Sequence, residues 1–224
     1  WDLDSVREKD DVIKEARKRG EKTHIGSLMT ICSEKFAELE EQFRVLKGRV
    51  VYRGDSANDE EGAAAVYQNL SASPTSIRGM NANIAYGRIP GHKTTSADAV
   101  KAYVQANLGA KHPTWVQIPK ELRPKHWKFS KPVCRLLKAL YGHPESGAHW
   151  EQHLSDGIKT IGGKPILGHP SMSWSQGARK QGSRVTFLPL APLMPPVNTL
   201  APNAASEDGS CKVVVVLIRS SSKN

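Results

Sequence analysis

The first 44 residues carry apolar positions at helical spacing among many charged residues. Residues 5–18 are predicted to form an amphipathic helix, because apolar side chains recur there in a narrow stripe. Ser33 is placed to cap a second helix, whose apolar residues are three and four apart. The apolar positions of the two helices are Val6, Val12, Ile13, Ala16, Phe36, Leu39 and Phe43. We therefore expect a helical N-terminal segment over residues 1–44.

Runs of β-branched and aromatic residues predict strands further along the chain. The expected strands are 49–52, 100–104, 115–118 and 213–218. A further helix is expected over residues 136–141, ended by Gly142 and Pro144. The last strand either pairs with the sheet or forms an exposed edge. This mixture predicts an α+β fold.

The composition changes at about Gly177. Prolines are so frequent in residues 187–196 that neither a helix nor a central strand is expected to persist through them. Residues 201–206 have the composition of a linker. We expect residues 177–224 to be an irregular, Pro-rich and largely disordered tail with one strand at 211–219. The abrupt change suggests a frame change, an exon boundary or decay of a genetic element as its origin.

The chain is basic, with a formal net charge of +10. Such a balance favours polyanions, because binding them releases counterions. Basic residues cluster in residues 14–22 and again in 120–131, where Lys125 and Lys128 flank Trp127. Cations mixed with aromatic rings can follow a phosphate backbone and stack unpaired bases. The same pattern fits a solvated loop that its aromatic residues pin to a core, and the sequence favours neither interpretation.

Four blocks of sequence occur in an order that resembles the reverse transcriptase of Ty1/copia-type retrotransposons. They are Lys47-Gly48-Arg49-Val50-Val51-Tyr52-Arg53-Gly54, Asp98-Ala99-Val100-Lys101-Ala102-Tyr103-Val104, Trp115-Val116-Gln117-Ile118-Pro119 and Cys134-Arg135-Leu136-Leu137-Lys138-Ala139-Leu140-Tyr141-Gly142. The resemblance implies a partial fingers and palm domain over residues 45–176. It also implies a role in template-directed nucleotidyl transfer, with RNA or DNA primer-template and a deoxynucleoside triphosphate as partners.

The resemblance also implies roles for single residues. Asp98 takes the place of a catalytic carboxylate that holds Mg²⁺ or Mn²⁺, and hard cations of this kind prefer oxygen ligands. Lys47, Arg49 and Arg53 take the places of the cations that grip the triphosphate, a role that suits Arg and Lys side chains. Tyr103 takes the place of the aromatic residue that sorts deoxyribose from ribose. Without the resemblance, Asp98 is more simply an N-cap and Tyr103 a core residue.

Two departures from the family pattern change the expected activity. The later Tyr-x-Asp-Asp hairpin is absent, and two-metal chemistry needs several carboxylates to clamp both ions. Asp98 alone is therefore expected to bind magnesium weakly, and the chain is expected to be inactive as a polymerase. Glu145 stands where many members carry Gln, and a carboxylate cannot donate as an amide does.

Several further expectations concern the setting of the chain. Cys32, Cys134 and Cys211 are too scattered for paired disulfides or a zinc knuckle, so we expect reduced thiols, an intracellular protein and no zinc. No long apolar span is present, so no membrane is expected. The start at Trp1 favours a segment of a larger Pol polyprotein, whose other segments are further partners.

Three functions therefore compete at this point. The preferred one is a copia-type Pol segment related to RNA-directed DNA polymerase. The alternatives are a non-catalytic basic nucleic-acid-binding protein and a decayed open reading frame without a selected function.

Overall fold

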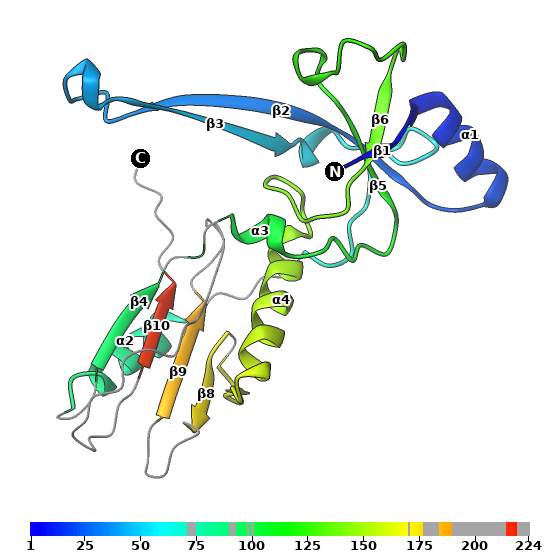
Figure 1. Ribbon diagram of the computed structural model, residues 1–224. Coiled ribbons are helices and arrows are strands. Elements are labelled where there is room, and N and C mark those ends of the chain that lie inside the picture. The colour runs from blue at the N-terminus through cyan, green and yellow to red at the C-terminus, as the bar shows by residue number, and fades with distance from the viewer. Residues whose placement is uncertain are drawn as a thin grey trace. The chain divides into compact units, whose positions relative to one another are not determined.

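The computed structural model describes residues 1–70, 75–89, 93–97, 99, 101–169, 171–176, 184–189 and 214–218 (Figure 1). The chain forms two compact units. The first contains Trp1–Asn69 and Asn107–Ser146, and the second contains Leu70–Ala106 and Gly147–Asn224. Each unit has its own five-stranded sheet. Helices and a mixed sheet occur together, so the α+β class is confirmed. The two units do not begin or end at residues 45 and 177, where the sequence analysis divides the chain.

The first unit is built on a mixed sheet with the strand order β1-β6-β5-β2-β3. β2 runs parallel to β5, and the other neighbours are antiparallel. The helices and strands of this unit are β1 (Asp2–Glu8), α1 (Lys9–Arg19), β2 (His24–Lys35), β3 (Val45–Tyr52), β5 (Thr114–Gln117) and β6 (Pro132–Arg135). Three 3₁₀ turns lie at Glu41–Phe43, Gly54–Ser56 and Lys120–Leu122.

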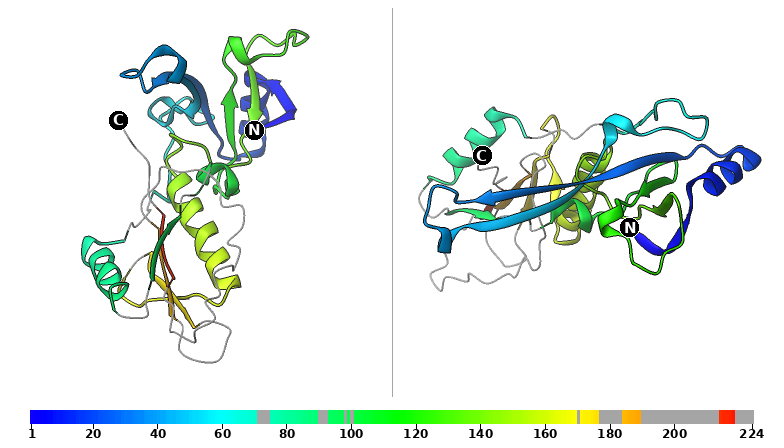
Figure 2. Two further views of the ribbon diagram at one scale, coloured as in Figure 1. Left: turned by 60° about the vertical axis from the view of Figure 1, so that its left-hand side comes forward. Right: turned by 90° about the horizontal axis from the view of Figure 1, so that it is seen from above.

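The second unit has the strand order β4-β10-β9-β8-β7. β10 runs parallel to both β4 and β9, whereas β9, β8 and β7 are antiparallel neighbours. Figure 2 shows α2 and α4 on opposite faces of this sheet. The elements are α2 (Ile77–Tyr86), β4 (Lys93–Ala97), α3 (Ala102–Gln105), α4 (Ser146–Thr160, from the unit boundary), β7 (Lys164–Pro165), β8 (Ser173–Gln176), β9 (Arg184–Pro189) and β10 (Val214–Ile218).

The amphipathic stripe of α1 covers the sheet of the first unit. Val12 of the helix packs with Ile25 and Val133 in a buried cluster, because apolar side chains on one helical face find an apolar sheet surface there. The helix predicted over residues 5–18 is thus confirmed, but it begins at Lys9. Residues 5–8 extend instead, since β1 pairs with β6 at this point.

The helix predicted from Ser33 is wrong. Residues 24–35 form β2, and Ser33 lies opposite Lys47 of β3 in a ladder of eight residue pairs. The apolar residues that suggested a helical face are exposed: Phe36, Leu39 and Phe43. With no core for that face, backbone pairing between β2 and β3 decides the structure.

Two other predicted elements are also wrong. Residues 136–141 are not helical, because their backbone groups bond to distant residues: the Leu136 amide donates to the Thr114 carbonyl (2.9 Å), and the Leu137 carbonyl accepts from the Leu108 amide (2.8 Å). These long-range hydrogen bonds outweigh the local helix propensity. In the strand expected at 100–104, the described residues from Ala102 onward belong to α3.

The remaining strand predictions are largely confirmed. The strands expected at 49–52, 115–118 and 213–218 correspond to β3, β5 and β10. The sequence predicts no central strand in the Pro-rich residues 187–196. This expectation is wrong for the first of them, because β9 reaches Pro189 and lies between β10 and β8 in the sheet. Its proline, Pro189, is the last residue of the strand, where a missing amide disrupts the ladder least.

Gly26 of β2 leaves room for the ring of Tyr52, and this close approach generates a prediction. A methyl group at Gly26 would overlap the Tyr52 ring, whereas one at Gly48 of the same hairpin has nothing within 4 Å. Because Tyr52 is buried and cannot move aside, Gly26→Ala should destabilise the fold by roughly 1–3 kcal/mol. Gly48→Ala is the matched control and should be neutral or slightly stabilising. Urea unfolding of both variants checks this, and equal midpoints would contradict it.

Candidate functional site

The β2–β3 hairpin extends beyond the rest of its sheet and brings three cations together (Figure 1). Only residues 24–27 of β2 pair with β5, and the ladder with β3 continues to Lys35. Side chains alternate between the two faces of a strand, and directly opposite residues share a face. The register pairs Ile31 with Arg49, Ser33 with Lys47 and Lys35 with Val45. Lys35, Lys47 and Arg49 therefore lie on one face, which we name the cationic face.

The charges of this face are uncompensated. Its members along the hairpin are Met29, Ile31, Ser33, Lys35, Val45, Lys47, Arg49 and Val51, and none of them is acidic. Among the described residues, no ion pair includes Lys35, Lys47 or Arg49. Burial, followed by the positive charge of Arg49 and the contact with Lys35, lowers the pKa of Lys47. The three cations are thus near enough to repel one another.

Arg53 does not join the cationic face. It follows the end of β3, and its guanidinium is paired with the Asp55 carboxylate at 3.0 Å. Arg44, at the other end of β3, is likewise near a carboxylate, with 3.9 Å to Glu34. Of the three cations predicted to bind a triphosphate, the hairpin therefore brings Lys47 and Arg49 together and adds Lys35, which the sequence did not indicate.

The other predicted residues of the nucleotide and metal site, Asp98 and Tyr103, are not part of the described hairpin. Asp98 lies outside the described residues. Tyr103 belongs to α3 in the second unit and is only 7% exposed, as a core side chain would be. Within the described part of the chain, no three His, Cys, Asp or Glu side chains come together as a metal site.

Lys125, Trp127 and Lys128 lie in the loop between β5 and β6. Both lysines are exposed, and Trp127 is half-buried. The Trp127 ring meets the ring of Phe129 edge to face, with 6.1 Å between the centroids. This loop therefore offers cations beside a pair of partly accessible rings, an arrangement that both sequence interpretations allow.

Sequence reasoning missed a buried polar cluster beneath the base of the hairpin. The Tyr52 and Tyr67 hydroxyls are hydrogen-bonded at 2.8 Å, and burial raises the pKa of both phenols. The His143 ring is 4.9 Å from the Tyr52 ring, and its Nε2 is 3.3 Å from the Thr114 hydroxyl. His24 meets Tyr67 at 4.6 Å. These residues come from distant parts of the sequence in no known motif, so no local signal could have revealed them.

Glu145 has a structural role in this cluster. It is only 4% exposed, and its Oε1 accepts hydrogen bonds from the amides of Gln68 (3.2 Å) and Asn69 (3.1 Å). Its Oε2 and the Nδ1 of His24 are buried without a hydrogen-bond partner in the described part of the chain. The carboxylate thus holds the 68–69 backbone, and a Gln carbonyl oxygen can accept the same two bonds.

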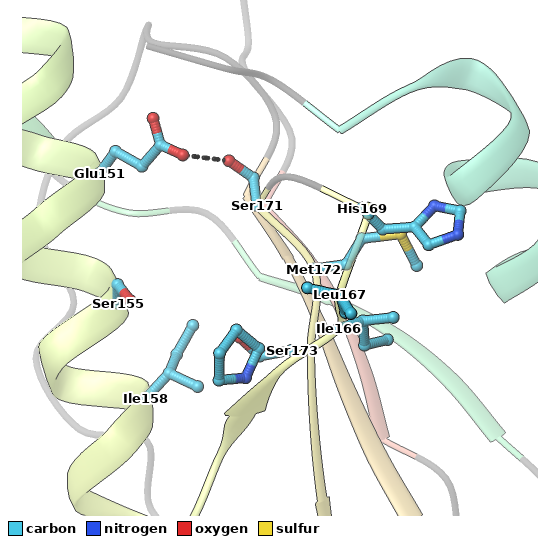
Figure 3. Close-up of a pocket in the computed structure, with 11 residues that line it drawn as sticks. Glu151, Ser155, Ile158, Ile166, Leu167, His169, Ser171, Met172 and Ser173 are labelled. Atoms are coloured by element: carbon cyan, nitrogen blue, oxygen red, sulfur yellow. Dashed lines mark hydrogen bonds between the residues drawn. The ribbon is translucent and has the colours of Figure 1, made fainter. Parts of the chain in front are cut away.

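The second unit contains a cavity of about 460 Å³ between α4 and residues 165–173 (Figure 3). Ile158 and Met172 contribute apolar walls, and at one end the Ser171 hydroxyl donates to the Glu151 carboxylate at 2.6 Å. A space of this size and lining suits a small, largely apolar molecule. None of the residues predicted from the sequence lines it.

Comparisons with models of known protein families, with curated proteins and with solved structures find no match to this chain. The resemblance to copia-type reverse transcriptases therefore rests on the sequence blocks alone. None of the helices that the structure describes is both long and apolar enough to cross a lipid bilayer.

Burial of His24 predicts a pH-dependent stability. Burial, and then the neighbouring His112, lowers the pKa of His24. The unfolded chain takes up the proton near pH 6.5, whereas the folded chain resists it, so stability should be full above that pH and fall as the pH drops below it. The charges that act on His24 are those of His112, Glu145, Glu60 and Asp59.

Urea unfolding between pH 7.5 and 5 measures this effect. His24→Asn should flatten the decline, because the group that resists protonation is gone. His126→Gln, in the exposed loop after β5, should reproduce the parent profile. A His24→Asn profile as steep as that of the parent would contradict the assignment.

The two hydrogen bonds accepted by Glu145 give a further prediction. Glu145→Ala leaves the amides of Gln68 and Asn69 without an acceptor and should cost about 1–3 kcal/mol of stability. Glu145→Gln keeps one acceptor in place and should cost less than the Ala variant. Thermal unfolding ranks the variants, and an Ala variant as stable as the Gln variant would show that the clamp is unimportant.

Proposed function

We propose that this chain is a segment of a copia-type retrotransposon Pol polyprotein, related to RNA-directed DNA polymerase, that binds nucleic-acid phosphates through the cationic face. The observation that carries the proposal is the grouping of Lys35, Lys47 and Arg49 without a carboxylate in any ion pair with them among the described residues. Lys47 and Arg49 are also the residues that the sequence resemblance assigns to phosphate binding.

Phosphate chemistry fits this group of side chains. Three positive charges on one face repel one another, and a bound polyanion replaces this repulsion with attraction. Arg49 adds a planar fork for two phosphate oxygens, and the lysines add compact point charges. The net charge of +10 draws polyanions to the chain as a whole.

We propose binding without nucleotide incorporation. Two-metal phosphoryl transfer needs several carboxylates around both ions. In the family that this chain resembles, the Tyr-x-Asp-Asp tetrapeptide supplies a pair of these carboxylates, and this sequence does not contain it. Mg²⁺ or Mn²⁺ at Asp98 and a deoxynucleoside triphosphate at Lys47 and Arg49 remain part of the proposal as family features. The loop with Lys125, Trp127 and Lys128 is a second contact for the same nucleic acid.

Fluorescence anisotropy with a labelled primer-template, at several salt concentrations, tests the proposal. Lys47→Gln/Arg49→Gln should weaken binding and reduce the slope of log affinity against log salt by about one for each lost contact. Arg44→Gln/Arg53→Gln is the matched control, because it removes the same charge from cations that lie beside carboxylates. It should change the slope little.

Equal losses in the two double variants would mean that overall charge, and not the cationic face, holds the nucleic acid. Primer extension with Mg²⁺ or Mn²⁺ is the second arm of this experiment, and no incorporation is expected. Extension by the parent chain that disappears in Asp98→Asn would overturn the proposal that binding is uncoupled from catalysis.

A further inference from the structure

The end of the hairpin has a different character from its cationic face. We name residues 36–43 the hairpin tip. Its three large apolar side chains are unusually accessible, with Phe36 50%, Leu39 46% and Phe43 57% exposed. Large apolar side chains gathered at one exposed place mark an interaction surface in most proteins. The tip is therefore expected to contact a partner.

The charge of the tip argues against a nucleic acid as that partner. The tip contains Glu38, Glu40 and Glu41 and no basic residue. None of these carboxylates belongs to an ion pair among the described residues, and Glu40 only accepts a hydrogen bond from the Gln42 amide at 2.8 Å. Phosphates next to three carboxylates would be repelled. The tip instead fits a surface that is both cationic and apolar.

The cationic face of a second copy of this chain is such a surface. Lys35, Lys47 and Arg49 lie there among exposed apolar side chains, of which Met29 is 43% and Ile31 41% exposed. On β3, the cationic part of the face spans the five residues from Val45 to Arg49, which is about 13 Å of strand. Three carboxylates of one copy can thus meet three cations of the other while apolar side chains cover one another.

We propose that two copies of this chain associate through antiparallel hairpins, so that each hairpin tip packs on the cationic face of the other copy. A two-fold axis between the hairpins makes both contacts equivalent, as in most homodimers. Burial of the apolar side chains supplies the affinity, and the opposite charges fix the orientation.

The alternative self-association, by the free edge of β3, is disfavoured by the same charges. β3 is the outer strand of its sheet, so a second β3 could extend it. Antiparallel pairing around the strand centre would bring Lys47 and Arg49 of both copies together, and like charges across strands destabilise the pair. Packing of tip on face avoids this repulsion.

This association does not rest on the proposed binding of nucleic acid, but it uses the same cations. A primer-template and a second copy therefore compete for Lys35, Lys47 and Arg49. The two proposals can fail separately, because one is measured without nucleic acid.

Sedimentation equilibrium of the full chain tests the association. The tip variant Glu38→Lys/Glu40→Lys/Glu41→Lys and the face variant Lys35→Glu/Lys47→Glu/Arg49→Glu should each associate at least about tenfold more weakly than the parent, since both contacts of the homodimer become repulsive. An equimolar mixture of the two variants should dimerise again, because each reversed tip then meets a reversed face. This recovery also shows that both variants are folded.

Two results would overturn the proposal. The first is a parent chain that stays monomeric at all concentrations, and the second is a mixture of the two variants that associates no better than either alone. If the parent is monomeric and its binding of primer-template is lost in Phe36→Ala/Phe43→Ala, the tip is assigned to nucleic acid instead. A chain that dimerises as expected but binds no primer-template would count against the proposed function alone.

Discussion

The packing of Tyr52 at the base of the hairpin is the contact on which the first unit depends. The Tyr52 ring lies against Gly26, where no larger residue fits, and its hydroxyl reaches the Tyr67 hydroxyl. Its amide donates to the Tyr141 carbonyl at 2.7 Å. Tyr52 thus ties β2, β3 and two later loops together through its side chain and its backbone amide, at the point where the buried part of β2 gives way to the exposed part. The orientation of the cationic face follows from this anchor, because the face continues the same two strands.

Beyond this anchor, the hairpin is held by backbone hydrogen bonds and has little core of its own. The side chains from Met29 to Val51 are exposed or half-buried, and the ladder between β2 and β3 pairs residues 28–35 with residues 45–52. A two-stranded ribbon is stable only when its base is fixed, as it is here by the sheet and by Tyr52. Exposed apolar side chains on such a ribbon gain nothing for the fold, which is why we assign them to an interface.

The parts of the fold that could be predicted are those that local sequence decides. β3 and β5 follow from runs of β-branched and aromatic residues, and α1 follows from its apolar stripe. Ser33 to Phe43 misled because an N-cap residue and helical spacing occur there by chance, while pairing with β3 and β5 requires contacts from distant sequence. Residues 136–141 do not form the predicted helix for the same reason, since the backbone groups of Leu136 and Leu137 bond to the distant residues Thr114 and Leu108.

The candidate site shows the same limit. Lys47 and Arg49 are two residues apart, so the alternation of a strand is enough to place both on one face. Lys35 joins them only because of the register of the hairpin, which no local pattern reveals. The buried cluster of His24, Tyr52, Tyr67 and Glu145 is assembled from four separate segments and carries no motif.

The energy stored in the cationic face is small beside the energy that holds the hairpin. Two unit charges two residues apart on a strand are about 6.6 Å from each other, and in water-like surroundings they repel by about 0.6 kcal/mol. The ladder and the Tyr52 anchor exceed this cost several-fold if each net hydrogen bond contributes about 1 kcal/mol. The fold therefore tolerates the three cations without needing a bound anion, and the charges can be reversed without unfolding the hairpin. The hairpin therefore keeps the same conformation whether the cationic face binds a phosphate or a carboxylate.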